Sequence, residues 1–193
     1  KQKTAYEIKE CDWSSDVCSS DLPDDLLDMV ADVTEEVMGI EAPIAPDVAL
    51  VEGDLIPSAL GDWEVIETPG HAPTHLCLLQ RERGILVAGD LIGPGYFPYF
   101  DYGYTQDPIA EYFLSLEKVD DLSGVTLILP GHGRPLDDLH GTVAMWQREL
   151  ALNVRKVEDA VRAGATNVWQ ATVAAYDVTE PNRYAVLWYE IGR

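Results

Sequence analysis

Three segments of this sequence share one design, in which an apolar β-type run ends in a tight glycine turn followed by a metal-competent side chain. They are Pro69-Gly70-His71 after residues 63–67, Gly89-Asp90 after residues 85–87, and Gly131-His132 after residues 125–129. Glycine allows the backbone to turn sharply, so the side chain that follows can project from the end of the strand. This design predicts a fold in which rigid strands carry ligand-bearing loops at the edge of a sheet.

His71, Asp90 and His132 are the candidate metal ligands in these turns. Two imidazoles and one carboxylate are suitable ligands for zinc or iron. The three residues lie far apart in the sequence, which excludes a local finger-type site and favours a catalytic site assembled from separate loops. A single histidine or aspartate after a glycine is commonly only a turn residue. The prediction therefore depends on the ordered set of three.

The spacing of apolar residues predicts a meandering sheet and several helices. Short β-type runs are expected at residues 48–51, 63–68, 75–80 and 85–88, with glycine and aspartate between them. Residues 125–129 form a continuous apolar run, which is typical of a strand buried on both faces. Helices are predicted at residues 23–38, from Asp107-Pro108 onward, along residues 143–161 with Gly164 as the stop, after a Thr166 cap, and at residues 182–193.

The first 22 residues differ from the remainder of the chain. They show neither helical nor strand periodicity, and they resemble the conceptual translation of a DNA sequencing-library adapter. A natural Ser- and Asp-rich disordered tail is the alternative that composition allows. The adapter interpretation predicts a non-native segment at residues 1–22, a partial domain at residues 23–193, and a native protein that extends further upstream. The last predicted helix has no stop signal, so the C-terminus is expected to be cut as well.

Charge and hydropathy narrow the class of partner. The formal net charge is −21, with 34 acidic residues against 13 lysines and arginines. The chain shows no concentrated basic surface of the kind that binds phosphate backbones, so nucleic acid is disfavoured as a substrate. No apolar run is long enough to span a bilayer, and no secretory signal is visible. We therefore expect a small-molecule substrate, no membrane partner and a cytoplasmic location, whereas the oligomeric state stays open.

Three longer motifs around the candidate ligands resemble the later motifs of metallo-β-lactamase-fold hydrolases. They are TPGHAPTH at residues 68–75, ILVAGD at residues 85–90 and LILPGHGRPL at residues 127–136. The resemblance extends roughly from Val48 to Tyr176 and includes the helical sequences on both sides of the last motif. It implies a mixed α/β (α+β) fold, an αββα sandwich with a dinuclear metal centre in the groove between sheet edges. For this chain it predicts a partial sandwich that lacks its N-terminal strands.

The resemblance also implies a role for each candidate ligand. His71 would bind the first metal, Asp90 would bridge both metals, and His132 would bind the second. An aspartate at the bridging position is more similar to the glyoxalase II-like and general hydrolase branches than to β-lactamases with a cysteine ligand. The implied cofactor is a pair of zinc ions, with iron or manganese as alternatives.

The family's His-x-His-x-Asp-His signature is absent from this sequence. In the family that motif supplies two ligands to each metal and the aspartate that assists the attacking hydroxide. No catalytic residue is therefore assigned in this chain. Three ligands shared by two metals predict weak zinc binding and little or no hydrolase activity for the chain as given.

Three further residues near the motifs have expected structural roles. On the family pattern His75 is not a metal ligand, and we expect it either to support a ligand or to start a strand. Cys77 lies in an apolar run and is predicted to be a small core residue. His140 begins a helix and is expected at the surface.

An aromatic loop at residues 95–104 follows Asp90 directly and could line a substrate pocket. The candidate pocket residues are Tyr96, Phe97 and Tyr99. An apolar, tyrosine-rich wall favours an ester, thioester or lactone substrate, although a packed surface loop is an equal alternative. The main hypothesis is the C-terminal part of a hydrolase that uses a metal-activated water. The alternatives are an iron-dependent sulfur dioxygenase of the same fold and a non-catalytic binding domain.

Overall fold

The computed structural model describes residues 47–95, 100, 105–176 and 178 of the chain. The predicted helices at residues 23–38 and 182–193, the adapter-like segment, and the candidate pocket residues Tyr96, Phe97 and Tyr99 lie outside the described residues. Internal contacts divide the chain into two compact units, and the unit that contains residues 48–152 holds the whole sheet. The candidate metal ligands all lie in that unit.

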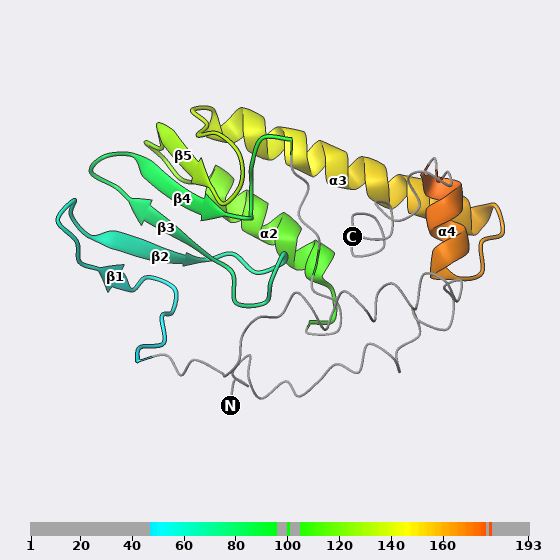
Figure 1. The fold of residues 1–193 in the computed structure, drawn as a ribbon, viewed down its shortest axis with the longest axis horizontal. Helices are drawn as coiled ribbons and strands as arrows, with labels where there is room; N and C mark the ends of the chain where they lie inside the picture. Colours follow the sequence, from blue (N-terminus) through cyan, green and yellow to red (C-terminus); the bar gives the residue numbers. More distant parts are fainter. Residues whose placement is uncertain (1–46, 96–99, 101–104, 177, 179–193) are drawn as a thin grey trace. The chain divides into compact units, whose positions relative to one another are not determined.

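Five strands and three helices make up the described part of the chain (Figure 1). The strands are β1 (Leu55–Ile56), β2 (Trp63–Glu67), β3 (Leu76–Gln80), β4 (Ile85–Gly89) and β5 (Leu127–Pro130), and the helices are α2 (Pro108–Asp120), α3 (Leu139–Arg162) and α4 (Val168–Ala175). The strands form one sheet in the order β1-β2-β3-β4-β5. β1 to β4 are antiparallel to their neighbours, and β5 pairs with β4 in parallel. The predicted meander and the mixed α/β class are confirmed.

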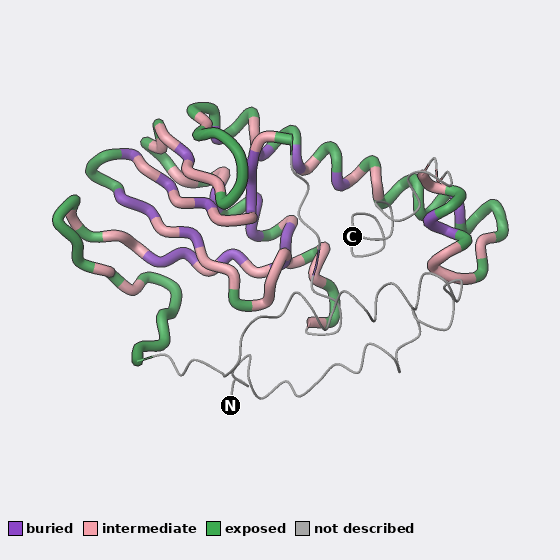
Figure 2. The backbone as a smooth tube through the Cα atoms, viewed as in Figure 1, coloured by how far each residue is buried: buried purple, intermediate pink, exposed green. Residues whose placement is uncertain are grey.

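One face of the sheet packs against α2 and α3 and forms the core. Strand register places Ile66 opposite Cys77 and Leu86 opposite Ile128, and paired residues point to the same side of a sheet. Their side chains are buried together with apolar side chains of both helices, among them Leu116, Val119, Val143 and Trp146. Buried residues alternate with partly buried ones along β4 and most of β3, whereas β2 buries the adjacent Val65 and Ile66 (Figure 2). This packing fixes the strands whose ends carry the candidate ligands.

α2 begins where the sequence predicts. The Asp107 side chain accepts a hydrogen bond from the Ala110 N–H at 2.9 Å, and Pro108 occupies the first helical position, where an N–H would have no helical partner. The buried residues of this helix are Tyr112, Ser115, Leu116 and Val119. The Tyr112 hydroxyl donates to the Leu91 carbonyl at 2.5 Å. This bond ties α2 to the loop that follows β4.

α3 ends near its predicted stop, Gly164, whereas its start at Asp138 was not predicted. The Asp138 side chain accepts a hydrogen bond from the Gly141 N–H at 2.9 Å. Gly164 lies two residues after Arg162, the last helical residue, and has a φ of 111°. Buried side chains in its first part are Leu139, Val143, Trp146 and Leu150. Later members of the same apolar stripe, Val154, Val157 and Val161, are exposed. Among the described residues, no helix combines the length and apolar character needed to cross a membrane.

The predicted strand at residues 48–51 is wrong. The Val51 N–H donates to the Asp54 carboxylate at 2.9 Å in an exposed turn, so this N–H is not available to a strand ladder. The first strand is instead β1, a two-residue edge strand that pairs with β2. Apolar composition alone does not distinguish the two positions.

Two other local predictions are corrected by the structure. The sequence predicts a strand buried on both faces at residues 125–129, but β5 begins two residues later and only Ile128 is buried in it, because β5 lies at an edge of the sheet. The sequence also predicts Thr166 as the cap of the short helix α4, but the cap is Asn167, whose side chain accepts from the Gln170 N–H at 2.9 Å. The Thr166 hydroxyl instead bonds the Gln170 side chain.

Candidate metal centre

The candidate ligands lie at one edge of the sheet, the edge formed by the ends of its strands. β2 and β4 are both antiparallel to β3, and β5 is parallel to β4, so β2, β4 and β5 all end at the same edge. His71 follows β2, Asp90 follows β4 and His132 follows β5. The strand ends thus bring together three loops that are distant in the sequence, and sites commonly form beyond the carboxyl ends of strands.

Asp90 lies between the two histidines. Its Oδ2 is 3.5 Å from His71 Nε2, and its Oδ1 is 3.5 Å from His132 Nε2. The exposed fraction of the side chain is 12% for His71, 26% for Asp90 and 62% for His132. The site therefore changes from partly buried at His71 to open at His132. One carboxylate oxygen facing each imidazole is the arrangement expected of a carboxylate between two ions.

The two separations fit metal coordination better than direct hydrogen bonding. A direct N–H···O bond usually spans about 2.9 Å. Two ligands that bind one tetrahedral zinc ion at about 2.1 Å lie about 3.4 Å from each other. Within the part of the chain that the structure describes, no group of three His, Cys, Asp or Glu side chains is placed to hold a single ion. The donors present therefore form two pairs that share Asp90.

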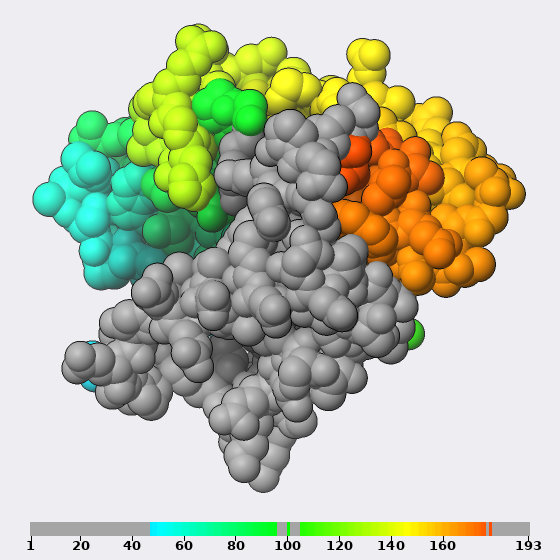
Figure 3. Space-filling model, turned by 45° about the vertical axis from the view of Figure 1, so that its right-hand side comes forward, coloured from blue at the N-terminus to red at the C-terminus, as the bar shows by residue number. Residues whose placement is uncertain are grey.

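Glycines allow the loops after β4 and β5 to pack backbone to backbone. A Cβ on Gly131 would collide with Asp90 Oδ1, and the Gly131 N–H donates to the Gly89 carbonyl at 2.7 Å. A Cβ on Gly93 would lie 3.3 Å from the His132 carbonyl oxygen. Figure 3 shows the yellow-green segment after β5 at the surface beside the green segment after β4. Side chains larger than hydrogen at Gly131 would displace the carboxylate from its place between the histidines.

His75 contacts the main chain of Asp90 rather than its carboxylate. The Asp90 N–H donates to His75 Nε2 at 3.1 Å, and His75 Nδ1 lies 2.8 Å from Thr68 Oγ1. Burial lowers the pKa of His75, and the neighbouring His71 lowers it further, whereas Asp90 and Thr68 act in the opposite direction. Sequence reasoning does not single out Thr68, although it opens the TPGHAPTH motif. Its role depends on strand pairing, which the motif does not specify.

Cys77 and His140 lie outside the candidate centre. Cys77 is fully buried, and burial raises the pKa of its thiol to about 12, so the side chain stays protonated and is no thiolate ligand. His140 is exposed in the first turn of α3, with Nδ1 2.8 Å from Asp120 Oδ1. The predicted core position of Cys77 and surface position of His140 are confirmed.

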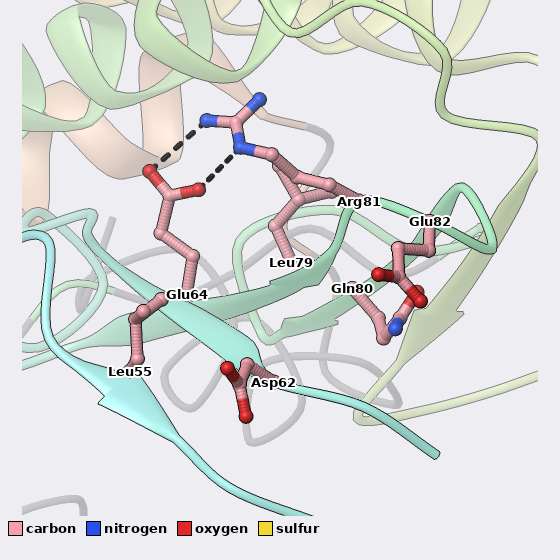
Figure 4. A pocket seen from close by; sticks show the side chains of 7 residues that line it. All are labelled: Leu55, Asp62, Glu64, Leu79, Gln80, Arg81 and Glu82. Atoms are coloured by element: carbon pink, nitrogen blue, oxygen red, sulfur yellow. Dashed lines mark hydrogen bonds and ion pairs between the residues drawn. The ribbon is translucent and has the colours of Figure 1, made fainter.

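A pocket opens at the opposite edge of the sheet, where β2 begins and β3 ends. Its lining residues are Leu55, Asp62, Glu64, Leu79, Gln80, Arg81 and Glu82. Arg81 donates two hydrogen bonds to the Glu64 carboxylate (Figure 4), and these bonds hold the pKa of Glu64 below its usual range. The candidate ligands follow the opposite strand ends, after β2, β4 and β5, so this pocket is separate from the candidate metal centre.

Known proteins match both this fold and the segments that carry the candidate ligands. The family model of the metallo-β-lactamase superfamily matches residues 17–164. This chain belongs to the metallo-β-lactamase superfamily. The predicted family is thereby confirmed, and the matched residues include His71, Asp90 and His132.

Curated relatives of this superfamily member are about one third identical to it over parts of their length. A probable metallo-hydrolase of Bacillus subtilis is 29% identical over 120 residues, which are 58% of this chain and 37% of the relative. An acyl-coenzyme A thioesterase of Gallus gallus is 33% identical over 99 residues, 47% of this chain and 32% of the relative. A hydroxyacylglutathione hydrolase of Rhodospirillum rubrum is 31% identical over 119 residues, 61% of this chain and 44% of the relative. The chain thus spans less than half the length of these relatives.

A solved structure supports the fold independently. A metallo-β-lactamase family protein of Thermus thermophilus superposes with a TM-score of 0.63 and 24% identity, over 77% of this chain and 48% of that protein. At this identity the likeness concerns the fold alone. It agrees with a partial metallo-β-lactamase fold for this chain.

Proposed function

We propose that this superfamily member contributes part of the dinuclear metal centre of a hydrolase that acts on thioesters. The observation that carries the proposal is the position of Asp90, whose two carboxylate oxygens each face one histidine Nε2 at 3.5 Å. Imidazole nitrogen and carboxylate oxygen are the ligands of catalytic zinc, and iron or manganese also accept them. His71 and Asp90 would hold one ion, and Asp90 and His132 would hold the other.

The residues of this chain would position the metal ions and determine from which side the substrate reaches them. Metal ions at this edge would lower the pKa of a bound water and polarise the thioester carbonyl. Asp90 would set the separation of the two ions, because its carboxylate lies between His71 in the loop after β2 and His132 in the loop after β5. His71 is mostly shielded from solvent and His132 is mostly exposed. We therefore expect the substrate to approach from the side of His132.

The names of relatives support a thioester as the substrate. A protein of Gallus gallus is an acyl-coenzyme A thioesterase, and one of Aspergillus fumigatus is an atrochrysone carboxyl ACP thioesterase. A third relative is a hydroxyacylglutathione hydrolase. An acyl group attached to a thiol carrier is the substrate type that these names share. Esters and lactones, which fit the same chemistry, have no such support among these names.

Weak zinc binding is expected of this chain by itself. Catalytic zinc usually takes three protein ligands, whereas the described residues offer two for each ion. The further ligands of the proposed centre would come from a His-x-His-x-Asp-His motif, which this sequence lacks. The chain alone is therefore expected to hydrolyse thioesters slowly or not at all.

Zinc titration of two matched histidine variants tests the proposal. We expect His132→Ala to lower zinc affinity more than about 10-fold at one ion, because loss of a ligand costs at least as much as loss of its supporting partner. We expect His140→Ala to leave affinity unchanged, since that imidazole contacts Asp120. Both side chains are exposed, at 62% and 72%. Cys11 and Cys18 would be replaced by serine in every protein, so that their thiols do not bind zinc.

Two results would contradict the proposal. Equal zinc affinities for His132→Ala and His140→Ala would show that His132 is not a zinc ligand. Rapid thioester turnover by the 193-residue chain would show that two ligands for each ion are sufficient, and that the expected dependence on further ligands is wrong.

A further inference from the structure

His75 is partly buried beside the candidate ligands, and it contacts the main chain of Asp90, not its carboxylate. Both of its ring nitrogens are engaged, Nε2 with the Asp90 N–H at 3.1 Å and Nδ1 with Thr68 Oγ1 at 2.8 Å. Thr68 Oγ1 lies 3.4 Å from Cys77 Sγ, and that thiol donates to the Ala88 carbonyl at 3.6 Å. Four side-chain contacts thus join the end of β2, the start of β3 and the end of β4.

The direction of every bond in this chain of contacts follows from one fixed donor. A backbone N–H can only donate, so His75 Nε2 must accept and carries no proton. The ring proton of a neutral histidine then lies on Nδ1 and is donated to the Thr68 hydroxyl. Thr68 in turn donates its own proton to Cys77, whose S–H points to Ala88. Between the Asp90 N–H and the Ala88 carbonyl, each side chain thus accepts one hydrogen bond and donates the next.

The surroundings hold the ring in this place. Thr68, Cys77 and Ala88 are fully buried. Gly89 has a φ of 51°, and a Cβ there would lie 2.6 Å from His75 Nε2, so only glycine leaves room for the ring beside the main chain of β4.

We propose that His75 is a positioning residue, held neutral as the Nδ1–H tautomer, which fixes the main chain at Asp90 and so orients its carboxylate between the histidines. The inference rests on the proposed function, because it assumes that Asp90 is a metal ligand. The Nε2 lone pair is occupied by the Asp90 N–H, so His75 itself does not bind metal. This distinguishes it from His71, whose ring lies edge-on to it with centroids 6.0 Å apart.

Two isosteric variants separate the two ends of the imidazole. In His75→Gln the side-chain oxygen can reach the position of Nε2 and accept from the Asp90 N–H. In His75→Asn the amide can replace Nδ1 and donate to Thr68, but nothing accepts from Asp90. Because each variant deletes one of the two bonds, both should shift the unfolding midpoint by similar amounts. Their zinc affinities should nevertheless differ.

Two measurements test the positioning role, the ring tautomer of His75 in the metal-free protein and the zinc affinities of the two variants. In the zinc-free wild type, nitrogen-15 spectra of the ring should show an unprotonated Nε2 and a protonated Nδ1. His75→Asn should lower zinc affinity about 10- to 100-fold, and His75→Gln should stay within about threefold of the wild type. A protonated Nε2 in the metal-free protein would overturn the inference. Equal zinc affinities for the two folded variants would overturn it as well.

The outcomes also separate this inference from the proposed function. If the wild type bound no zinc through His71 and His132, the proposed function would fail whatever the tautomer of His75. If zinc bound there but both His75 variants lost zinc affinity only in proportion to their loss of stability, the metal centre would be supported. The positioning role of His75 would then be wrong. If His75→Asn did not fold, the wild-type tautomer and the His75→Gln affinity would still decide.

Discussion

Gly70→Ala is expected to destabilise the folded chain by roughly 3–5 kcal/mol, through overpacking together with backbone strain. Gly70 has a φ of 137°, and a Cβ there would lie 2.5 to 2.7 Å from the Cβ, Cα and N atoms of Tyr112 in α2. A helix backbone cannot move aside as a flexible side chain does. Either α2 separates from the turn or the turn that presents His71 deforms. Urea unfolding followed by circular dichroism would measure the loss.

Gly53→Ala is the matched control for this prediction. Gly53 also has a positive φ, 84°, but no atom lies within 4 Å of the Cβ position. Only the strain of a left-handed backbone should appear, about 1–2 kcal/mol. Similar losses for the two variants would show that the contact with α2 contributes nothing. The predicted difference between them measures how tightly α2 supports the His71 turn.

Asp90→Asn is expected to have the largest effect on metal binding, lowering zinc affinity at both ions by more than about 100-fold, beyond the cost of losing a supporting partner. The reason is geometric, because each oxygen of the carboxylate faces a different histidine at 3.5 Å. The amide has the same size but no negative charge and only one oxygen. The His132 variant should weaken one ion, whereas the Asp90 variant should weaken both. Competition with a chromophoric chelator would resolve the two affinities.

Asp107→Asn is a suitable control for the Asp90 variant. It makes the same change of charge and atom type at a residue that caps α2. Asparagine caps helices about as well as aspartate, so folding should be preserved. Zinc affinity of this control should equal that of the wild type. A comparable loss in both variants would assign the binding to the overall negative charge and not to Asp90.

The candidate site was predictable from the sequence because its parts are local. Each ligand follows a β-type run and a glycine turn, so its place at a strand end depends only on neighbouring residues. The convergence of His71, Asp90 and His132 then follows from strand directions, which short connections between β2, β3 and β4 already favour. The ligand roles themselves stay predictions, since only metal-binding measurements test them.

Features that depend on pairing between distant residues were not predictable. Thr68 meets His75 because register places Glu67 opposite Leu76, and no property of the threonine itself signals this contact. β1 is defined by two residues that pair with β2, not by its own apolar pattern. Thr166 and Asn167 are adjacent polar residues, and either could cap α4. Only the hydrogen bond from the Gln170 N–H to the Asn167 side chain identifies the cap.

The most direct test of the central claim is a zinc titration of the nitrogen-15 histidine-labelled chain, observed at the ring nitrogens. The chain has four histidines, His71, His75, His132 and His140, so the four rings can be followed separately. We predict that zinc shifts the Nε2 signals of His71 and His132 together and leaves the rings of His75 and His140 in their metal-free states. Zinc-dependent shifts at His75 or His140, or no shift at His71 and His132, would contradict a centre built around Asp90.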